Sequence, residues 1–182
     1  MRIIIMIAAL LLPMWNTQAE TSSGPAILTL SGDISNTNRA GTDEFNDAFF
    51  ASHDVEFERA YTFDLSALEA LGVHKVTVSH EDWPKAFTFE GPLLSDLLKT
   101  VGADGDTLII RALDGYAPEI PSADAAKYPV ILALKRDGNY LGLGGRGPVW
   151  LIYPRNDFPE LKSEDDSKFV WSAYHIEVKN EQ

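Results

Sequence analysis

The feature that most constrains this fold is a series of short β-prone segments separated by turn signals. Turn dipeptides such as Asp114-Gly115 and Asp137-Gly138 divide apolar runs that are mostly shorter than the about 11 residues of an average helix. We expect strands at residues 26–30, 56–64, 73–79, 86–89, 107–113, 117–121, 129–134, 149–153 and 168–178. The pattern predicts a mixed α+β domain that is mostly β.

Short helices are expected between some of these strands, at residues 42–50, 64–72 and 92–102, with a single turn at 122–125. Asp64 is a good N-cap residue, and Pro92 suits the first helical position. Gly102 follows a run of leucines that are spaced for one helical face, so it is expected to end that helix.

The last expected strand, residues 168–178, is apolar on both of its faces. Phe169 and Trp171 alternate with Val170 and, further on, Tyr174. A strand of this kind is too apolar to form an exposed edge of a sheet. We therefore expect it inside a sheet, with Trp171 in the hydrophobic core.

Residues 1–19 have the pattern of a secretory signal peptide. Arg2 supplies the positive start, residues 3–12 form an apolar run, and Ala19 is the small residue expected at a cleavage site. The run is too short to span a bilayer, which takes about 20 residues. We expect export to the periplasm without direct membrane insertion, and one domain over residues 20–182.

Charge and cysteine content narrow the classes of partner. The chain has 27 acidic and 15 basic residues, a formal net charge of −12, which repels phosphate backbones and argues against nucleic acid. It has no cysteine, so the chain offers no disulfide and no thiolate for catalysis or metal binding. A small ligand or a basic protein surface fits this composition better.

Residues 141–154 form a glycine-rich segment that runs into an apolar strand. Its four glycines give the backbone access to positive φ and to close contact with a ligand. Arg146, placed among them, carries a planar guanidinium with five hydrogen-bond donors. The segment predicts either a loop that binds an anion or carbonyl group, or a plain hairpin connection.

A set of motifs in fixed order gives the chain a family resemblance. The motifs are Phe63-Asp-Leu-Ser-Ala-Leu, Phe89-Glu-Gly-Pro-Leu-Leu-Ser-Asp-Leu-Leu, Ala112-Leu-Asp-Gly-Tyr116, Ile120-Pro121, Leu132-Ala-Leu and Gly147-Pro-Val-Trp-Leu-Ile-Tyr-Pro154. In their order and spacing, over about residues 26–178, the chain resembles the molybdopterin-binding domain of the sulfite oxidase family, in particular its small exported stand-alone members.

The resemblance implies a mixed α+β fold in which a pterin lies in a cleft and a cysteine thiolate binds molybdenum. In this chain Ser79 stands about where that thiolate is expected, and a serine alkoxide is a poor soft ligand. Trp150 stands near the place of a basic residue that often follows the family's Gly-Pro. Both departures argue against an intact molybdenum site.

The chain is most similar to a subset of that family, periplasmic pterin-binding regulators. These keep the fold and the cleft without the metal, and they report a reduced pterin to a membrane-bound enzyme of cyclic di-GMP metabolism. The resemblance therefore implies a reduced pterin as ligand, no molybdenum, and the periplasmic domain of an inner-membrane signalling protein as partner.

A pterin has a flat face, two adjacent hydrogen-bond donors on its pyrimidine edge, and an oxo acceptor beside them. Aromatic rings, a carboxylate, and a guanidinium or backbone amide would bind these groups. The candidates are Trp83, Tyr116 and Trp150 for the face, Asp114 and Asp137 for the donors, Arg111, Arg146 and the amides of Gly145 and Gly147 for the oxo group, and Ser79 nearby.

Several of these residues have plainer interpretations. Asp114 and Asp137 precede glycine and suit ordinary turns, and Trp150 suits a core position. His80, beside two acidic residues in a polar loop, is expected to be solvated. Two other functions remain open: a molybdopterin-dependent oxidoreductase with Ser79 as metal ligand, and a scaffold whose partner surface acts without the cleft. We favour a binding protein over an enzyme.

Overall fold

The computed structural model describes residues 24–162 and 166–180 of the 182-residue chain. The expected signal peptide, residues 1–19, lies outside the described part. The fold is mixed α+β, mostly β with short helices, as the segment pattern predicts. No helix of the described residues is long and apolar enough to cross a membrane.

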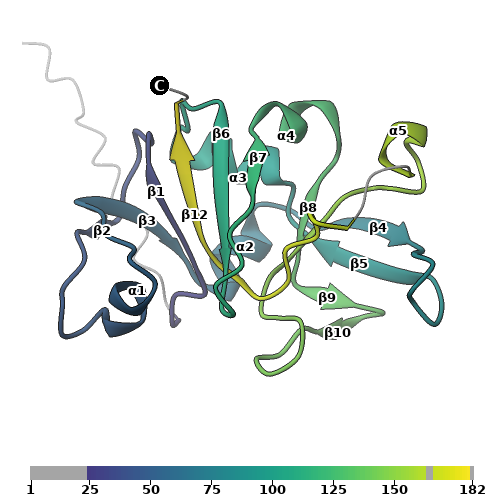
Figure 1. Cartoon of the computed structure of the whole chain (residues 1–182), viewed down its shortest axis with the longest axis horizontal. Helices are drawn as coiled ribbons and strands as arrows, with labels where there is room; N and C mark the ends of the chain where they lie inside the picture. The colour runs from purple at the N-terminus through teal and green to yellow at the C-terminus, as the bar shows by residue number, and fades with distance from the viewer. Residues whose placement is uncertain (1–23, 163–165, 181–182) are drawn as a thin grey trace, which may run out of the picture.

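The largest sheet has six strands in the order β2-β3-β1-β12-β6-β7. Their bounds are β2 Arg39–Ala40, β3 Arg59–Phe63, β1 Leu28–Gly32, β12 Ala173–Lys179, β6 Thr107–Ala112 and β7 Glu119–Pro121. β12 pairs parallel with β1 and antiparallel with β6. It therefore lies inside the sheet, which confirms that this apolar segment is not an edge strand (Figure 1).

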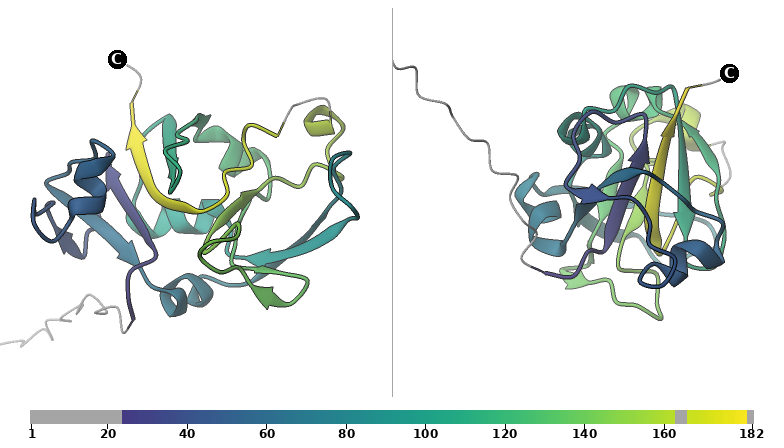
Figure 2. Two further views of the ribbon diagram at one scale, coloured as in Figure 1. Left: turned by 60° about the horizontal axis from the view of Figure 1, so that its bottom comes forward. Right: turned by 90° about the vertical axis from the view of Figure 1, so that its left-hand side faces the viewer.

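A four-stranded sheet and a strand pair complete the β structure. The sheet has the order β10-β9-β5-β4, with β10 Asn139–Tyr140, β9 Lys135–Arg136, β5 Phe87–Gly91 and β4 His74–Val78. The pair joins β11 (Trp150–Ile152) to β8 (Ile131–Ala133). The larger sheets lie at opposite ends of the molecule, with β8 between them (Figures 1 and 2).

Within residues 24–162 and 166–180, five short helices connect the strands: α1 Ala48–Ser52, α2 Leu65–Ala70, α3 Leu94–Val101, α4 Ala123–Lys127 and α5 Pro159–Lys162. The side chain of Asp64 caps α2 by accepting a hydrogen bond from the Ala67 amide at 2.7 Å. Gly102 ends α3 in the left-handed conformation, at φ 60°. These two helix ends match the predictions from sequence, whereas Pro92 precedes the N-cap residue Leu93 and is not the first residue of α3.

One hydrophobic core joins the three sheets. Leu30 and Ile176 from the six-stranded sheet, Phe89 from the four-stranded sheet and Leu132 from the strand pair all have no exposed surface and belong to one cluster. Because the sheets share this core, neither end of the molecule can move away without exposing apolar surface. The core therefore fixes the loops that meet between the sheets.

Two predicted elements are placed wrongly. The helix expected at residues 42–50 is α1, which begins only at Ala48, because the Asp43 carboxylate accepts the amides of Phe45 and Asn46 and forms a turn first. The strand expected at residues 168–178 begins only at Ala173. Ser172 has φ +54°, which is incompatible with an extended chain, so the residues before it turn away.

Candidate functional site

Four of the ten residues singled out in the sequence line one cleft. It has a volume of about 390 Å³ and lies where the loop after β4, the turn after β6, the glycine-rich loop, and the segment before β12 meet. Its lining residues are Trp83, Tyr116, Arg146, Trp150, Asp166, Ser167, Phe169 and Trp171. The sequence predictions Trp83, Tyr116, Arg146 and Trp150 thus lie together although they are far apart in the chain.

Trp150 forms the floor of the cleft. Its side chain is buried, and its indole Nε1 donates a hydrogen bond to the Phe169 carbonyl at 3.3 Å. The ring lies 5.6 Å from the ring of Trp83 and 5.1 Å from that of Phe89, centroid to centroid. Trp150 is therefore both a core residue and a wall of the cleft, so the two interpretations from sequence are compatible.

Arg146 lies over this aromatic floor. Its guanidinium carbon is 4.8 Å from the centroid of the Trp150 ring and 6.0 Å from that of Trp171, a cation–π arrangement. The backbone behind it is held in place, because the Arg146 carbonyl accepts the Ser172 amide at 3.0 Å. The guanidinium stays exposed, with its donors accessible to a ligand.

The rim is closed by a contact between two turns. The Tyr116 hydroxyl donates to the Ser167 carbonyl at 2.9 Å, which ties the turn after β6 to the segment before β12. Asp166, next to Ser167 in the chain, is an exposed acidic residue that also lines the cleft. Asp114 does not line the cleft; its Oδ1 accepts the Tyr116 amide at 3.0 Å, which is the turn role expected for an Asp-Gly pair.

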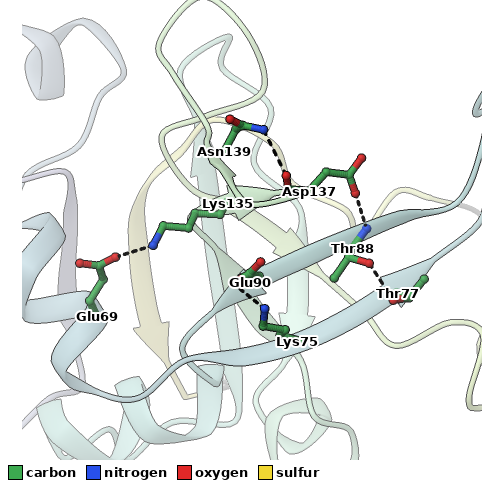
Figure 3. A network of polar contacts seen from close by, with 8 residues as sticks. All are labelled: Glu69, Lys75, Thr77, Thr88, Glu90, Lys135, Asp137 and Asn139. Atoms are coloured by element: carbon green, nitrogen blue, oxygen red, sulfur yellow. Dashed lines mark hydrogen bonds and ion pairs between the residues drawn. The ribbon is translucent and has the colours of Figure 1, made fainter.

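Arg111 and Asp137, two predicted ligand contacts, lie away from the cleft. Arg111 on β6 forms an ion pair with Glu177 at 2.8 Å in the six-stranded sheet. Asp137 lies in the turn between β9 and β10, where its carboxylate accepts the Thr88 amide (Figure 3). It also pairs with Lys85 at 2.8 Å. Hydrogen bonding to Lys85, with that amide, lowers the pKa of the Asp137 carboxyl.

Ser79, Gly145 and Gly147, three further predicted ligand contacts, do not line the cleft either. The Ser79 hydroxyl receives a hydrogen bond from the Asn156 side chain at 3.1 Å and is not part of the cleft lining. Gly147 is buried against the backbone of Leu141, so its small size serves packing of the loop. The Gly145 amide donates to the Gly142 carbonyl at 3.3 Å, within the loop itself.

The structure adds cleft residues that the sequence does not reveal. Trp171 was expected in the core, yet it is 36% exposed and faces the cleft, because the turn at Ser172 lifts it out of the strand. Asp166 and Phe169 lie in the preceding turn, in which the Phe169 amide donates to the Asp166 carbonyl at 2.8 Å. The sequence signal for these cleft residues is weak: an acidic run that ends at Asp166 stands close to the aromatic residues Phe169 and Trp171. This pattern does not show that they lie near the glycine-rich loop.

His80 is also not solvated as expected. Its side chain is only 8% exposed, its ring lies 5.8 Å from that of Trp83, and its Nδ1 lies 3.6 Å from the Asp82 carboxylate. The carbonyl of His80 accepts the Trp83 amide at 3.0 Å. His80 therefore supports the position of Trp83 at the cleft.

The cleft has the chemistry of a site for a flat, polar heteroaromatic molecule. Its walls are indole and phenyl rings, and its polar groups are one guanidinium, one carboxylate and one phenol. Among the described residues, no three His, Asp or Glu side chains converge in a way that could hold a metal ion. Neither a scan against protein-family models nor a search of curated proteins finds a match for this chain.

Proposed function

We propose that the cleft binds a reduced pterin and that the protein is a periplasmic pterin-binding regulator with a sulfite-oxidase-like fold. The observation that carries the proposal is the position of Arg146, whose guanidinium lies over Trp150 at the mouth of a cleft lined by three indoles. A cation held on an aromatic floor, with its donors exposed, favours a planar ligand that carries an acceptor.

The polar groups of the cleft match those of a pterin edge. A carboxylate accepts the two adjacent donors of a pyrimidine edge, and Asp166 takes the part that the sequence assigns to Asp114 or Asp137. Arg146 has donors for the oxo group beside them. Trp83, Trp150 and Trp171 offer ring faces and edges to the bicyclic system.

The regulatory part of the proposal rests on the family resemblance and on the absence of cysteine from the sequence. In this proposal the protein carries no molybdenum and reports the bound pterin to the periplasmic domain of an inner-membrane enzyme of cyclic di-GMP metabolism. The oxidoreductase alternative requires metal ligation by Ser79, whose hydroxyl is hydrogen-bonded to Asn156 outside the cleft lining.

Calorimetric titration of the purified full chain with a tetrahydropterin tests the proposal. We expect saturable binding by the wild type, and a loss of roughly 1 to 3 kcal/mol of binding free energy in Arg146→Ala, because a charge-assisted hydrogen bond is removed. Arg136→Ala is the matched control, since Arg136 is also exposed and stacks on an aromatic ring, that of Phe87 at 4.7 Å. It is expected to bind like the wild type.

If the Arg146 and Arg136 variants bind tetrahydropterin with equal affinity, the cleft is not the binding site. If the wild type gives no heat of binding, the protein is not a pterin-binding protein. Elemental analysis of protein exported from a molybdenum-replete host tests the alternative function. A stoichiometric amount of molybdenum that is lost in Ser79→Ala would favour the oxidoreductase and contradict our proposal.

A further inference from the structure

A second hollow, lined mostly by apolar groups, includes two residues of α1 in its lining. The helix α1 lies on the side of the molecule that faces the viewer in Figure 2, right. The hollow has a volume of about 260 Å³ and shares no lining residue with the cleft. The residues that line this groove come from β1 and the chain just before it, from β2, α1 and β12, from the turn after β6, and from the glycine-rich loop. They are Ala26, Ile27, Thr29, Arg39, Phe49, Phe50, Leu113, Leu143, Pro148 and Tyr174.

Large apolar side chains stand exposed in and beside this groove. Leu143, at the tip of the glycine-rich loop, is 75% exposed, and Phe49 on α1 is 44% exposed. Phe45, in the turn before α1, is 90% exposed. Exposed aromatic and aliphatic groups around a hollow are typical of a protein interaction site, because covering them removes apolar surface from water.

The surface next to the groove is acidic. Asp43, Glu44 and Glu56, from the segments before and after α1, line another hollow that includes Ala51 of this helix, and all three are exposed. The nearby guanidinium of Arg39 does not neutralise them, because it pairs with Asp47 and lies 5.3 Å from the ring centroid of Phe50 and 5.2 Å from that of Phe57. An apolar groove beside unpaired negative charge is complementary to an apolar side chain flanked by cations.

We propose that this groove, with its acidic border, docks a segment of a partner protein that presents apolar side chains flanked by lysine or arginine. The inference rests on the proposed function in one respect, namely that the protein has a protein partner. Leu143 in the groove and Arg146 in the cleft belong to one loop. The docking surface and the ligand site thus share a segment while their other lining residues differ.

Fluorescence anisotropy with an amphipathic peptide, leucines on one face and lysines on the other, tests the docking surface. The wild-type full chain is expected to bind it in the micromolar range. Leu143→Ser is expected to weaken binding at least tenfold, whereas Val73→Ser, which alters another exposed aliphatic residue outside the groove, is expected to leave it unchanged. Because Leu143 is three-quarters exposed, its loss is not expected to affect folding.

Charge reversal tests the acidic border separately. Glu56→Lys is expected to weaken binding of the lysine peptide at least threefold at low salt, whereas Glu119→Lys, an exposed carboxylate on β7, leaves it unchanged. A peptide with serine in place of every leucine is expected not to bind. If it binds as well as the leucine peptide, or if Leu143→Ser binds like the wild type, the inference is overturned.

Two other occupants of the groove would also overturn it. One is a second copy of the chain, shown by a concentration-dependent dimer that Phe49→Ser dissociates. The other is lipid, shown by binding to phosphatidylcholine vesicles that Leu143→Ser abolishes while the peptide does not bind. The two proposals fail separately: loss of peptide binding with intact pterin binding contradicts the docking surface alone, and the reverse contradicts the ligand alone.

Discussion

At the scale of single residues, two tryptophans of the cleft differ in burial, and we expect them to differ in role. Trp150 is 2% exposed and Trp171 is 36% exposed, although both flank the guanidinium of Arg146. Trp150 packs on Phe89 and Trp83 in the core, whereas Trp171 stands on a turn at the surface. The same substitution at the two positions should therefore have different effects.

Trp171→Ala is expected to change the free energy of unfolding by less than about 1 kcal/mol and to weaken tetrahydropterin binding by about 1 kcal/mol, through loss of a stacking surface. Trp150→Ala is expected to cost about 3 to 5 kcal/mol of stability, because it leaves a cavity in the core. Urea denaturation and calorimetry measure the two quantities. Equal destabilisation by both variants would contradict these roles.

His175 is a fully buried histidine in the middle of the six-stranded sheet. Burial, with the nearby charges of Arg111 and Arg39, lowers its pKa to about 3. Arg111 has only donors to offer, so Nδ1 of His175 is the acceptor at 3.4 Å, and Nε2 carries the proton toward the Ser31 hydroxyl at 2.9 Å. The folded protein therefore keeps this imidazole neutral.

The neutral imidazole makes stability depend on pH in a defined window. In the unfolded chain His175 binds a proton below its ordinary pKa of about 6.5, whereas in the folded protein it does so only near pH 3. Protonation therefore favours the unfolded state between these two pH values. The contribution of His175 to stability is full above pH 6.5 and is lost as the pH falls from 6.5 toward 3. Between pH 7 and 5.5 we expect a loss of about 1 kcal/mol from this residue. Urea denaturation of His175→Gln should lack that loss, and an unchanged pH dependence would contradict the assignment.

At the scale of elements, the glycine-rich loop is built around one close backbone contact. A Cβ added to Gly147 would lie 2.4 Å from the backbone of Leu141, whereas one added to Gly142 would meet nothing within 4 Å. The Gly147 carbonyl also accepts the Ser172 hydroxyl at 2.9 Å. These contacts join the loop to the segment that leads into β12, and so they hold Arg146 next to Trp171.

Gly147→Ala is expected to destabilise the protein by about 1 to 3 kcal/mol, because backbone must move to admit the methyl group, and to weaken pterin binding as Arg146 shifts. Gly142→Ala is the matched control and is expected to change stability by less than about 1 kcal/mol. Thermal denaturation monitored by circular dichroism measures the difference. Equal melting temperatures would show that the contact with Leu141 is not required.

Local sequence patterns predict correctly those helix ends and strands that depend mainly on neighbouring residues. The N-cap at Asp64, the glycine stop at Gly102 and the interior position of β12 are found as expected, because each depends on nearby residues or on the alternation of one strand. The two-residue strand β2 exists only through pairing with β3, so no local signal predicts it. Strands β9 and β10 pair with each other across Asp137-Gly138, a turn signal that the sequence does carry, and β9 also pairs with the distant β5. The position of Trp171 depends likewise on the backbone at Ser172.

At the scale of the whole molecule, the cleft is a product of long-range packing. It brings together the loop after β4, the turn after β6, the glycine-rich loop and the segment before β12, around a core that joins all three sheets. The sequence supplies the residue types, and four of the predicted contacts meet there. It could not give their partners Asp166 and Trp171, because those positions follow from the assembled sheet.

This arrangement gives the molecule built-in reporters. The chain has four tryptophans, and the three within the described residues, Trp83, Trp150 and Trp171, all line the cleft. Trp15 belongs to the expected signal peptide, outside the described residues, so the exported protein is expected to lack it; replacing it with phenylalanine also removes this indole from any uncleaved chain.

Fluorine NMR of that Trp15→Phe protein, labelled with 5-fluorotryptophan and titrated with a tetrahydropterin, tests the central claim most directly. Binding in the cleft predicts three resonances that all shift and saturate together. In Arg146→Ala the same shifts are expected only at a roughly 5- to 150-fold higher ligand concentration, which is the predicted loss of about 1 to 3 kcal/mol expressed as affinity. Three resonances that stay unchanged at saturating pterin would contradict the claim that this cleft is a pterin site.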